Sequence, residues 1–95
     1  LEQIIEKICH NPALCYNVKE RGFIREGYWA DLVILDFLKV GEIDQMPMMH
    51  KCGWSAFSDV AFRTQILTTI VSGNIAYEGN KIPEQPFGLE LEFNN

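Results

Sequence analysis

The sequence predicts a mostly β chain with helices at its N-terminus, from three patterns. Apolar residues recur at helical spacing at the start of the chain, at Leu1, Ile4, Ile5 and Ile8. Four consecutive branched residues, Leu32 to Leu35, indicate a strand that is buried on both faces. An Ile- and Thr-rich run over residues 65–71 precedes a turn at Ser72-Gly73-Asn74 and a return strand over 75–77, which together predict a β-hairpin.

Length and charge limit the possible functions. The 95 residues suffice for one domain or part of one, with a core that gives only marginal stability. The net charge is −5, and the 8 Lys and Arg residues are spread along the chain, which argues against a nucleic-acid partner. The 3 cysteines form no disulfide pattern, and no apolar stretch is long enough to span a bilayer. We therefore expect a soluble, cytoplasmic chain with no membrane partner.

The N-terminal pattern predicts two helices. The first is expected to end near Cys9, and Asn11 as N-cap with Pro12 at the first helical position predicts a short second helix over residues 12–16. Because the apolar stripe begins at residue 1, which is not Met, we expect preceding sequence to be missing, although a processed terminus gives the same pattern. The glycines that follow indicate turns and a short strand, with Phe23 and Ile24 as a buried pair.

Two acids flank the first predicted strand. Asp31 and Asp36 are expected to be solvated or hydrogen-bonded strand ends. Along a strand they would lie about 16 Å apart, too far for paired general acid/base work.

The second half of the chain begins with an irregular stretch over residues 39–59. We expect its apolar cluster to cover a boundary with absent sequence, a ligand surface being the alternative; its members are Met46, Met48, Met49, Trp54 and Phe57. Residues 78–81 indicate a second turn, and alternating Leu89, Leu91 and Phe93 predict a half-buried edge strand.

The residues that could carry chemistry form no convincing site. A zinc site could be imagined at His10 with Cys9 and Cys15, or at His50 with Cys52. Neither group has the paired CxxC or H-x₃₋₅-H spacing of a structural zinc module, which argues against both. A Cys–His nucleophile lacks a marked oxyanion hole or orienting group, and adjacency of Lys51 to Cys52 does not place its charge near the sulfur. We therefore assign no catalytic, substrate-binding or metal-binding residue.

The order of four segments resembles the C-terminal part of the cyclic amidohydrolases, and most closely the dihydroorotases. The segments are NPA, GFIREGYWADLVILD, KCGWSAF and TTIVSGNIAYEG. Every position of the family signature is filled, by Gly22, Ile24, Gly27, Ala30, Asp31, Leu32, Val33 and Asp36. Residues 51–55 favour the dihydroorotases, and the resemblance weakens beyond about Pro83. Residues 56–59 depart from it, because Ala56 stands where the family usually has Pro.

The resemblance implies that residues 1–17 are the terminal helices of an absent TIM-type barrel. Residues 18–95 would be the C-terminal part of a small β-sandwich that is assembled from both chain ends. The family's zinc centre and its general-base aspartate would lie upstream of residue 1, so no catalytic role passes to His10, Asp31, Asp36, His50 or Lys51.

The resemblance also implies an activity for the intact enzyme, the reversible zinc-dependent hydrolysis of dihydroorotate to carbamoyl-aspartate in pyrimidine biosynthesis. This chain alone is expected to be inactive and to bind no metal. Its expected partners are the missing barrel and sandwich strands, and a second copy in a homo-oligomer. Two alternatives stay open: another cyclic amidohydrolase, of hydantoinase or allantoinase type, and a free-standing structural or interaction module.

Overall fold

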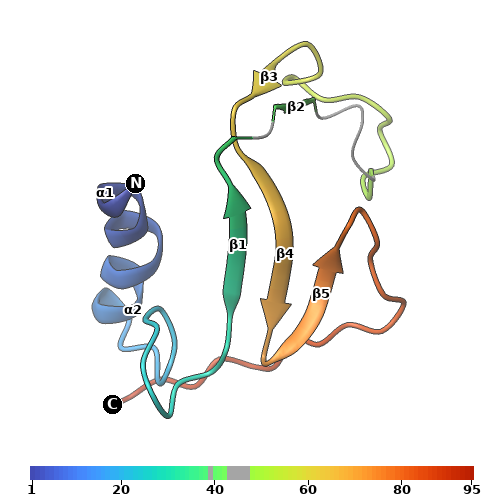
Figure 1. Ribbon diagram of the computed structural model, residues 1–95. Helices are drawn as coiled ribbons and strands as arrows, with labels where there is room; N and C mark the ends of the chain where they lie inside the picture. The colour runs from blue at the N-terminus through green and yellow to red at the C-terminus, as the bar shows by residue number, and fades with distance from the viewer. Residues whose placement is uncertain (39, 43–47) are drawn as a thin grey trace.

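A helical segment lies beside an antiparallel sheet in the computed structural model of the chain, which describes residues 1–38, 40–42 and 48–95 (Figure 1). The helical elements are α1 (Glu2–Ile5), the π-helical η1 (Glu6–His10) and α2 (Asn11–Cys15). The strands are β1 (Leu32–Asp36), β2 (Gly41–Glu42), β3 (Ala61–Phe62), β4 (Gln65–Val71) and β5 (Asn74–Glu78). The prediction of a mostly β chain with an N-terminal helical segment is confirmed at this level.

The helical segment is continuous from Glu2 to Cys15, so the predicted break into two helices is wrong. Asn11 has helical torsion angles and is not an N-cap, and its N–H donates to the Glu6 carbonyl, five residues back. Pro12 has no N–H, and in a regular α-helix its ring would clash with the carbonyl four residues earlier. A wider π-helical turn directly before Pro12 accommodates the ring without ending the helix.

The loop after α2 folds back against the helix at Gly22. A Cβ on this residue would lie 2.4 Å from the Ala13 Cβ and 2.8 Å from the Cys9 carbonyl oxygen. Phe23 stacks on the His10 ring, with centroids 4.3 Å apart. Ile24, in contrast, is 87% exposed, so the prediction of a buried Phe23–Ile24 pair is wrong for Ile24.

The larger sheet has the order β1-β4-β5, with antiparallel neighbours. The β4–β5 hairpin is confirmed: Val71 pairs with Asn74 across a two-residue turn. Ser72 and Gly73 both have positive φ, at 50° and 82°, as the type I′ turn requires. The second predicted turn is also confirmed, since Glu78 and Lys81 exchange backbone hydrogen bonds of 3.1 and 3.0 Å.

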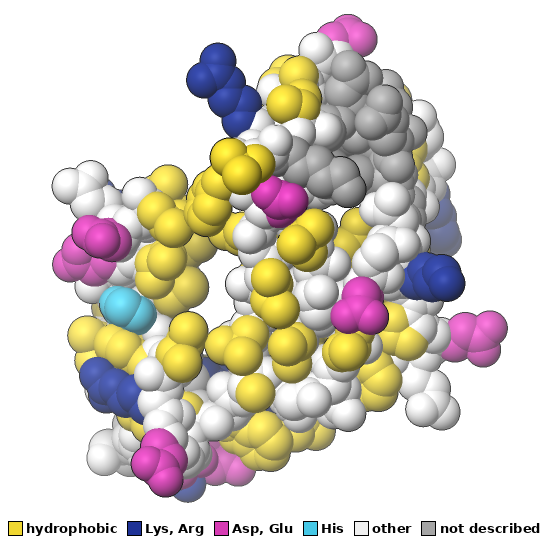
Figure 2. Space-filling model, in the orientation of Figure 1, with side chains coloured by type: hydrophobic (Ala, Val, Ile, Leu, Met, Phe, Trp, Pro, Cys, Tyr) yellow, Lys and Arg dark blue, Asp and Glu magenta, His cyan; other side chains and the backbone are white. Residues whose placement is uncertain are grey.

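Strand β1 forms where it was predicted, but its predicted burial on both faces is wrong for this chain. Val33 and Ile34 are adjacent and therefore point to opposite faces, and they are 53% and 48% exposed. The described helical elements do not pack broadly on the sheet. Figure 2 shows an opening between the helical segment and the sheet, lined by hydrophobic side chains.

The predicted edge strand over residues 89–93 is not formed. The tail runs back beside the C-terminal end of the helical segment (Figure 1) and makes a single bridge there, between Val18 and Phe93. Two backbone hydrogen bonds of 2.8 Å flank the bridge, from Lys19 N–H to the Glu92 carbonyl and from Asn94 N–H to the Asn17 carbonyl. The alternating residues Leu89, Leu91 and Phe93 are about half exposed.

The chain as a whole exposes more surface than its size predicts. Its accessible surface is 7950 Å², whereas a compact monomer of 10.9 kDa exposes about 5,600 Å². The radius of gyration is 15.3 Å, against about 12 Å for a compact domain of this length. Ala13 is the sole hydrophobic residue classed as buried in the part that the structure describes. No helix in that part is both long and apolar enough to cross a membrane.

Candidate functional site

The first acid of the signature, Asp31, joins two distant parts of the chain. One carboxylate oxygen pairs with the Arg21 guanidinium, and the other accepts the Ser72 N–H at 2.8 Å. The Gly73 N–H donates to the Ala30 carbonyl at 3.0 Å, so two successive N–H groups of the β4–β5 turn are bound by the segment that precedes β1. The Arg21 side chain is only 10% exposed and its guanidinium lies 5.3 Å from the Trp29 ring centroid. We call the group Arg21–Asp31–Ser72 the signature clasp.

The second acid, Asp36, makes a local contact at the other end of β1. Its carboxylate accepts the Leu38 N–H at 2.9 Å. Both acids are therefore hydrogen-bonded strand ends, as predicted. Because they occupy opposite ends of one strand, they share no reaction centre.

The residues around His10 do not converge on a common point. The His10 ring stacks on Phe23, Cys9 is half-buried, and Cys15 is exposed with a free thiol. Across residues 1–38, 40–42 and 48–95, no three His, Cys, Asp or Glu side chains come together as metal ligands would. The described residues therefore do not fit a zinc centre.

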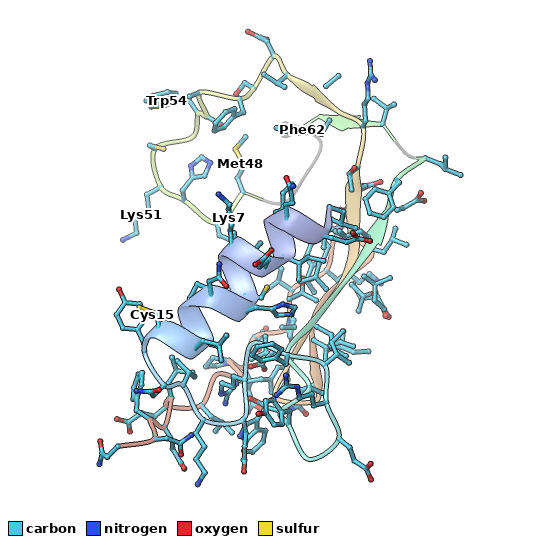
Figure 3. All side chains as sticks on the ribbon, turned by 90° about the vertical axis from the view of Figure 1, so that its left-hand side faces the viewer. Lys7, Cys15, Met48, Lys51, Trp54 and Phe62 are labelled. Atoms are coloured by element: carbon cyan, nitrogen blue, oxygen red, sulfur yellow. The ribbon has the colours of Figure 1, made fainter. Side chains whose placement is uncertain are left out.

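The loop between β2 and β3 does bring a cysteine and a histidine together. The Cys52 Sγ lies 3.1 Å from the His50 Nδ1 and 3.4 Å from the Trp54 carbonyl oxygen. Sequence alone could not show this contact, because an H-x-C spacing leaves the side-chain directions open in an irregular loop. The neighbouring Lys51 extends away from the loop (Figure 3).

The same loop is closed by a turn of its own. Ser55 and Ser58 exchange hydrogen bonds, and the Phe57 N–H donates to the Ser55 Oγ at 3.1 Å. The Phe57 ring then meets Phe62 of β3 edge-on, at 6.4 Å between centroids. The apolar residues Met49, Trp54 and Phe57 of the predicted cluster are mostly exposed, and Met46 lies outside the described residues.

Two depressions lie near the C-terminal end of the helical segment. The larger, of about 520 Å³, is mostly apolar and lies between the helix and the tail; Ile8, Pro12, Tyr16, Leu91 and Phe93 are among its lining residues. The smaller, of about 360 Å³, is lined by charged side chains and Trp29. Its two cations are already paired, since Lys19 lies 3.3 Å from Glu92 and Arg21 contacts Asp31, and the carboxylates of Glu20 and Glu90 line it as well.

A further candidate surface is apolar. Leu1, Ile4 and Ile8 of the helical segment are 61%, 58% and 67% exposed. Together with the half-exposed Val33 and Ile34 of β1, they leave both the helix and the sheet without a cover. The geometry therefore suits contact with further polypeptide better than it suits a reaction.

Comparison with known proteins identifies the relatives of the chain. Residues 1–76 match the sequence model of the Amidohydrolase family. A dihydroorotase of Pyrococcus abyssi is 31% identical over 91 residues, which are 96% of this chain and 22% of that protein. A dihydroorotase of Clostridium acetobutylicum is 36% identical over 75 residues, covering 79% of this chain and 18% of that protein. One of Archaeoglobus fulgidus is 39% identical over 54 residues, covering 57% and 13%.

The match to the family model extends from the helical segment into β5, so it includes every position of the signature. The chain spans about a fifth of the length of the curated relatives it matches. On this evidence the chain belongs to the amidohydrolase family.

Proposed function

We propose that this chain is the C-terminal structural part of a dihydroorotase-type amidohydrolase. The observation that carries the proposal is the alignment of nearly the whole chain with proteins named dihydroorotase, of which it spans only about a fifth. The family model alone does not separate dihydroorotases from hydantoinases. The names of the relatives favour the first.

We place residues 1–17 at the end of a TIM-type barrel and residues 18–95 in the C-terminal part of a β-sandwich. The exposed apolar stripe on the helical segment supports this placement, because a barrel helix buries such a stripe against its neighbours. The two uncovered faces of β1 support it as well, since a strand inside a sandwich and beside a barrel is covered on both sides.

The amount of surplus surface agrees with this role. The chain exposes roughly 2,400 Å² more than a compact monomer of its mass would. Obligate interfaces bury about 1,000–2,500 Å² on each partner. The rest of the enzyme is the partner that we assign to this surface, and pairing of complete subunits in a homo-oligomer would cover what is left.

The chemistry of the complete enzyme would be the reversible hydrolysis of a cyclic amide. Water oxygen adds to the ring carbonyl of dihydroorotate, the C–N bond breaks, and the ring nitrogen takes a proton to give carbamoyl-aspartate. Because the described residues do not fit a zinc centre, we assign the zinc and the general base to the part of the enzyme that this chain does not span. Such an enzyme would act in pyrimidine biosynthesis in the cytoplasm.

The test is an assay of the full-length protein for ring opening of dihydroorotate, with hydantoin and allantoin as competing substrates. We expect turnover of dihydroorotate that a metal chelator abolishes, and no turnover by the 95-residue chain. Preference for hydantoin or allantoin would assign the protein to another cyclic amidohydrolase. Turnover by the 95-residue chain itself would overturn the structural role.

A further inference from the structure

We propose that residues 89–94 form a strap that closes over the signature clasp and opens together with it. The strap lies beyond residues 1–76, which match the family model, and the inference does not depend on the substrate of the complete enzyme. Three observations carry it: where the strap is anchored, which side chains it brings to Arg21, and how Arg21 is connected to the β4–β5 turn.

The strap is anchored where the helical segment ends (Figure 1). The helix stops in a Schellman motif, in which the Val18 N–H donates to the Ala13 carbonyl at 2.9 Å. The N–H of Asn17, which has a φ of +54°, donates to the Leu14 carbonyl at 3.4 Å. The Asn17 carbonyl in turn accepts the Asn94 N–H at 2.8 Å. The strap therefore binds a carbonyl whose direction is fixed by the end of the helix.

Backbone hydrogen bonds, rather than charge, hold the strap in place. The Lys19 N–H donates to the Glu92 carbonyl at 2.8 Å, and this bond and the bond to Asn17 flank the bridge between Val18 and Phe93. The Lys19 ammonium also lies 3.3 Å from the Glu92 carboxylate. The two side chains are 44% and 74% exposed, and ion pairs with such exposure contribute little.

The strap presents its side chains to two depressions that share Arg21. Glu90 and Glu92 line the charged depression, whereas Leu91 and Phe93 line the apolar one, as the alternation of an extended chain requires. Arg21 lines both, and its side chain is only 10% exposed. The strap therefore helps to keep water away from the guanidinium, and an ion pair is stronger where water is excluded.

The signature clasp carries this effect to the β4–β5 turn. Arg21 pairs with one carboxylate oxygen of Asp31, and the other oxygen accepts the Ser72 N–H at 2.8 Å. When the strap detaches, water reaches Arg21 and weakens its pair with Asp31, so the carboxylate is held less firmly against Ser72. Because coupling is reciprocal, loss of the Asp31 charge loosens the strap. The strap and the clasp form one unit of local opening.

The experiment compares amide hydrogen exchange in the full-length protein and in Asn94→Pro, which removes the N–H that anchors the strap. We expect the Lys19 amide to exchange about tenfold faster, because its acceptor leaves with the strap. The Ser72 amide, which the strap does not touch, should exchange about threefold faster through the clasp. Asn95→Pro is the matched control and should leave both rates unchanged, since the Asn95 N–H donates no backbone hydrogen bond within the described residues.

The reciprocal variant Asp31→Asn keeps the size of the side chain and removes its charge. The Asn94 amide should then exchange about threefold faster. The Glu78 amide, which is bonded in the second turn of the hairpin, reports general stability and should keep its rate in every variant. The proposal is overturned if the Lys19 or Ser72 rate does not change in Asn94→Pro, or if Asp31→Asn leaves the Asn94 rate unchanged. An equal rise at Glu78 would also overturn it, because the effect would then be a general loss of stability.

Discussion

Individual side chains explain why the signature acids belong to the scaffold. Asp31 uses both carboxylate oxygens, one for a guanidinium that is almost fully buried and one for a backbone N–H in a distant turn. Charge-assisted hydrogen bonds of this kind are stronger than neutral ones, and the removal of one partner leaves the other without compensation. Asp36 accepts a single hydrogen bond, from the N–H of Leu38, which is two residues further along the chain. Asp31 therefore connects distant parts of the chain, whereas Asp36 makes only a local contact.

Substitution of these two acids should separate the signature clasp from an ordinary strand end. We expect Asp31→Ala to lower the free energy of unfolding by about 2–3 kcal/mol, because it leaves the buried Arg21 and the Ser72 N–H without an acceptor. The matched change Asp36→Ala removes one local acceptor and should cost about 0.5–1 kcal/mol. Urea unfolding of the full-length protein measures both values. Equal losses would show that the contacts of Asp31 add nothing beyond a local turn.

The packing of the helix against the following loop depends on one position without a side chain. Gly22 has a φ of +84° and approaches the helix so closely that a Cβ would overlap Ala13 and the Cys9 carbonyl. Gly27 has a similar φ of +82°, but open space surrounds the position of its missing Cβ. A comparison of Gly22 with Gly27 therefore separates two effects of adding a side chain: backbone strain, which both positions share, and steric overlap, which only Gly22 has.

Alanine at each glycine should give different losses of stability. Gly27→Ala should cost about 1 kcal/mol, the penalty of a left-handed conformation for an L-residue. Gly22→Ala adds overlap with the helix and should cost about 1–3 kcal/mol more. Thermal or urea unfolding of the full-length protein provides the comparison. If the two variants lose the same stability, the loop can move away from the helix without cost, and the close approach at Gly22 is not required.

Local signals account for the elements that the sequence predicts correctly. The type I′ turn at Ser72-Gly73 and the apolar run of β1 need no distant partner to be recognised. The predicted helix boundary at Asn11-Pro12 is wrong. An Asn-Pro pair indicates the start of a helix only if the preceding helix has ended, and here a π-helical turn joins the residues before the pair to those after it. The tail strand is wrong because alternation makes a strand only where a free sheet edge lies alongside. The contact between His50 and Cys52 depends on the path of the loop, which has no sequence period.

The molecule as a whole is more open and exposes more surface than a compact domain of its size. Exposed apolar residues lie on the helical segment and on both faces of β1 as well as in the loops and the tail, and the space between the helical segment and the sheet is open (Figure 2). A sheet with uncovered faces and unpaired edges is a ready site for association. The apolar run of β1 predicts a buried strand but does not specify which segments cover it, and the described residues leave Val33 and Ile34 about half exposed.

The 95-residue chain in isolation should therefore self-associate into a dimer or a higher oligomer. Replacement of the apolar residues on the two faces of β1, in the double variant Val33→Lys/Ile34→Lys, should shift the population toward monomer, because each lysine places a charge in the surface that the copies share. The change Ile24→Lys is the control, since Ile24 is 87% exposed on a loop and lies outside both faces of the sheet. Light scattering over a range of concentrations measures the mass of each variant. A well-folded monomer at high concentration would show that the faces of β1 remain stable in contact with water. The physical argument that these faces are normally covered by further polypeptide would then be lost.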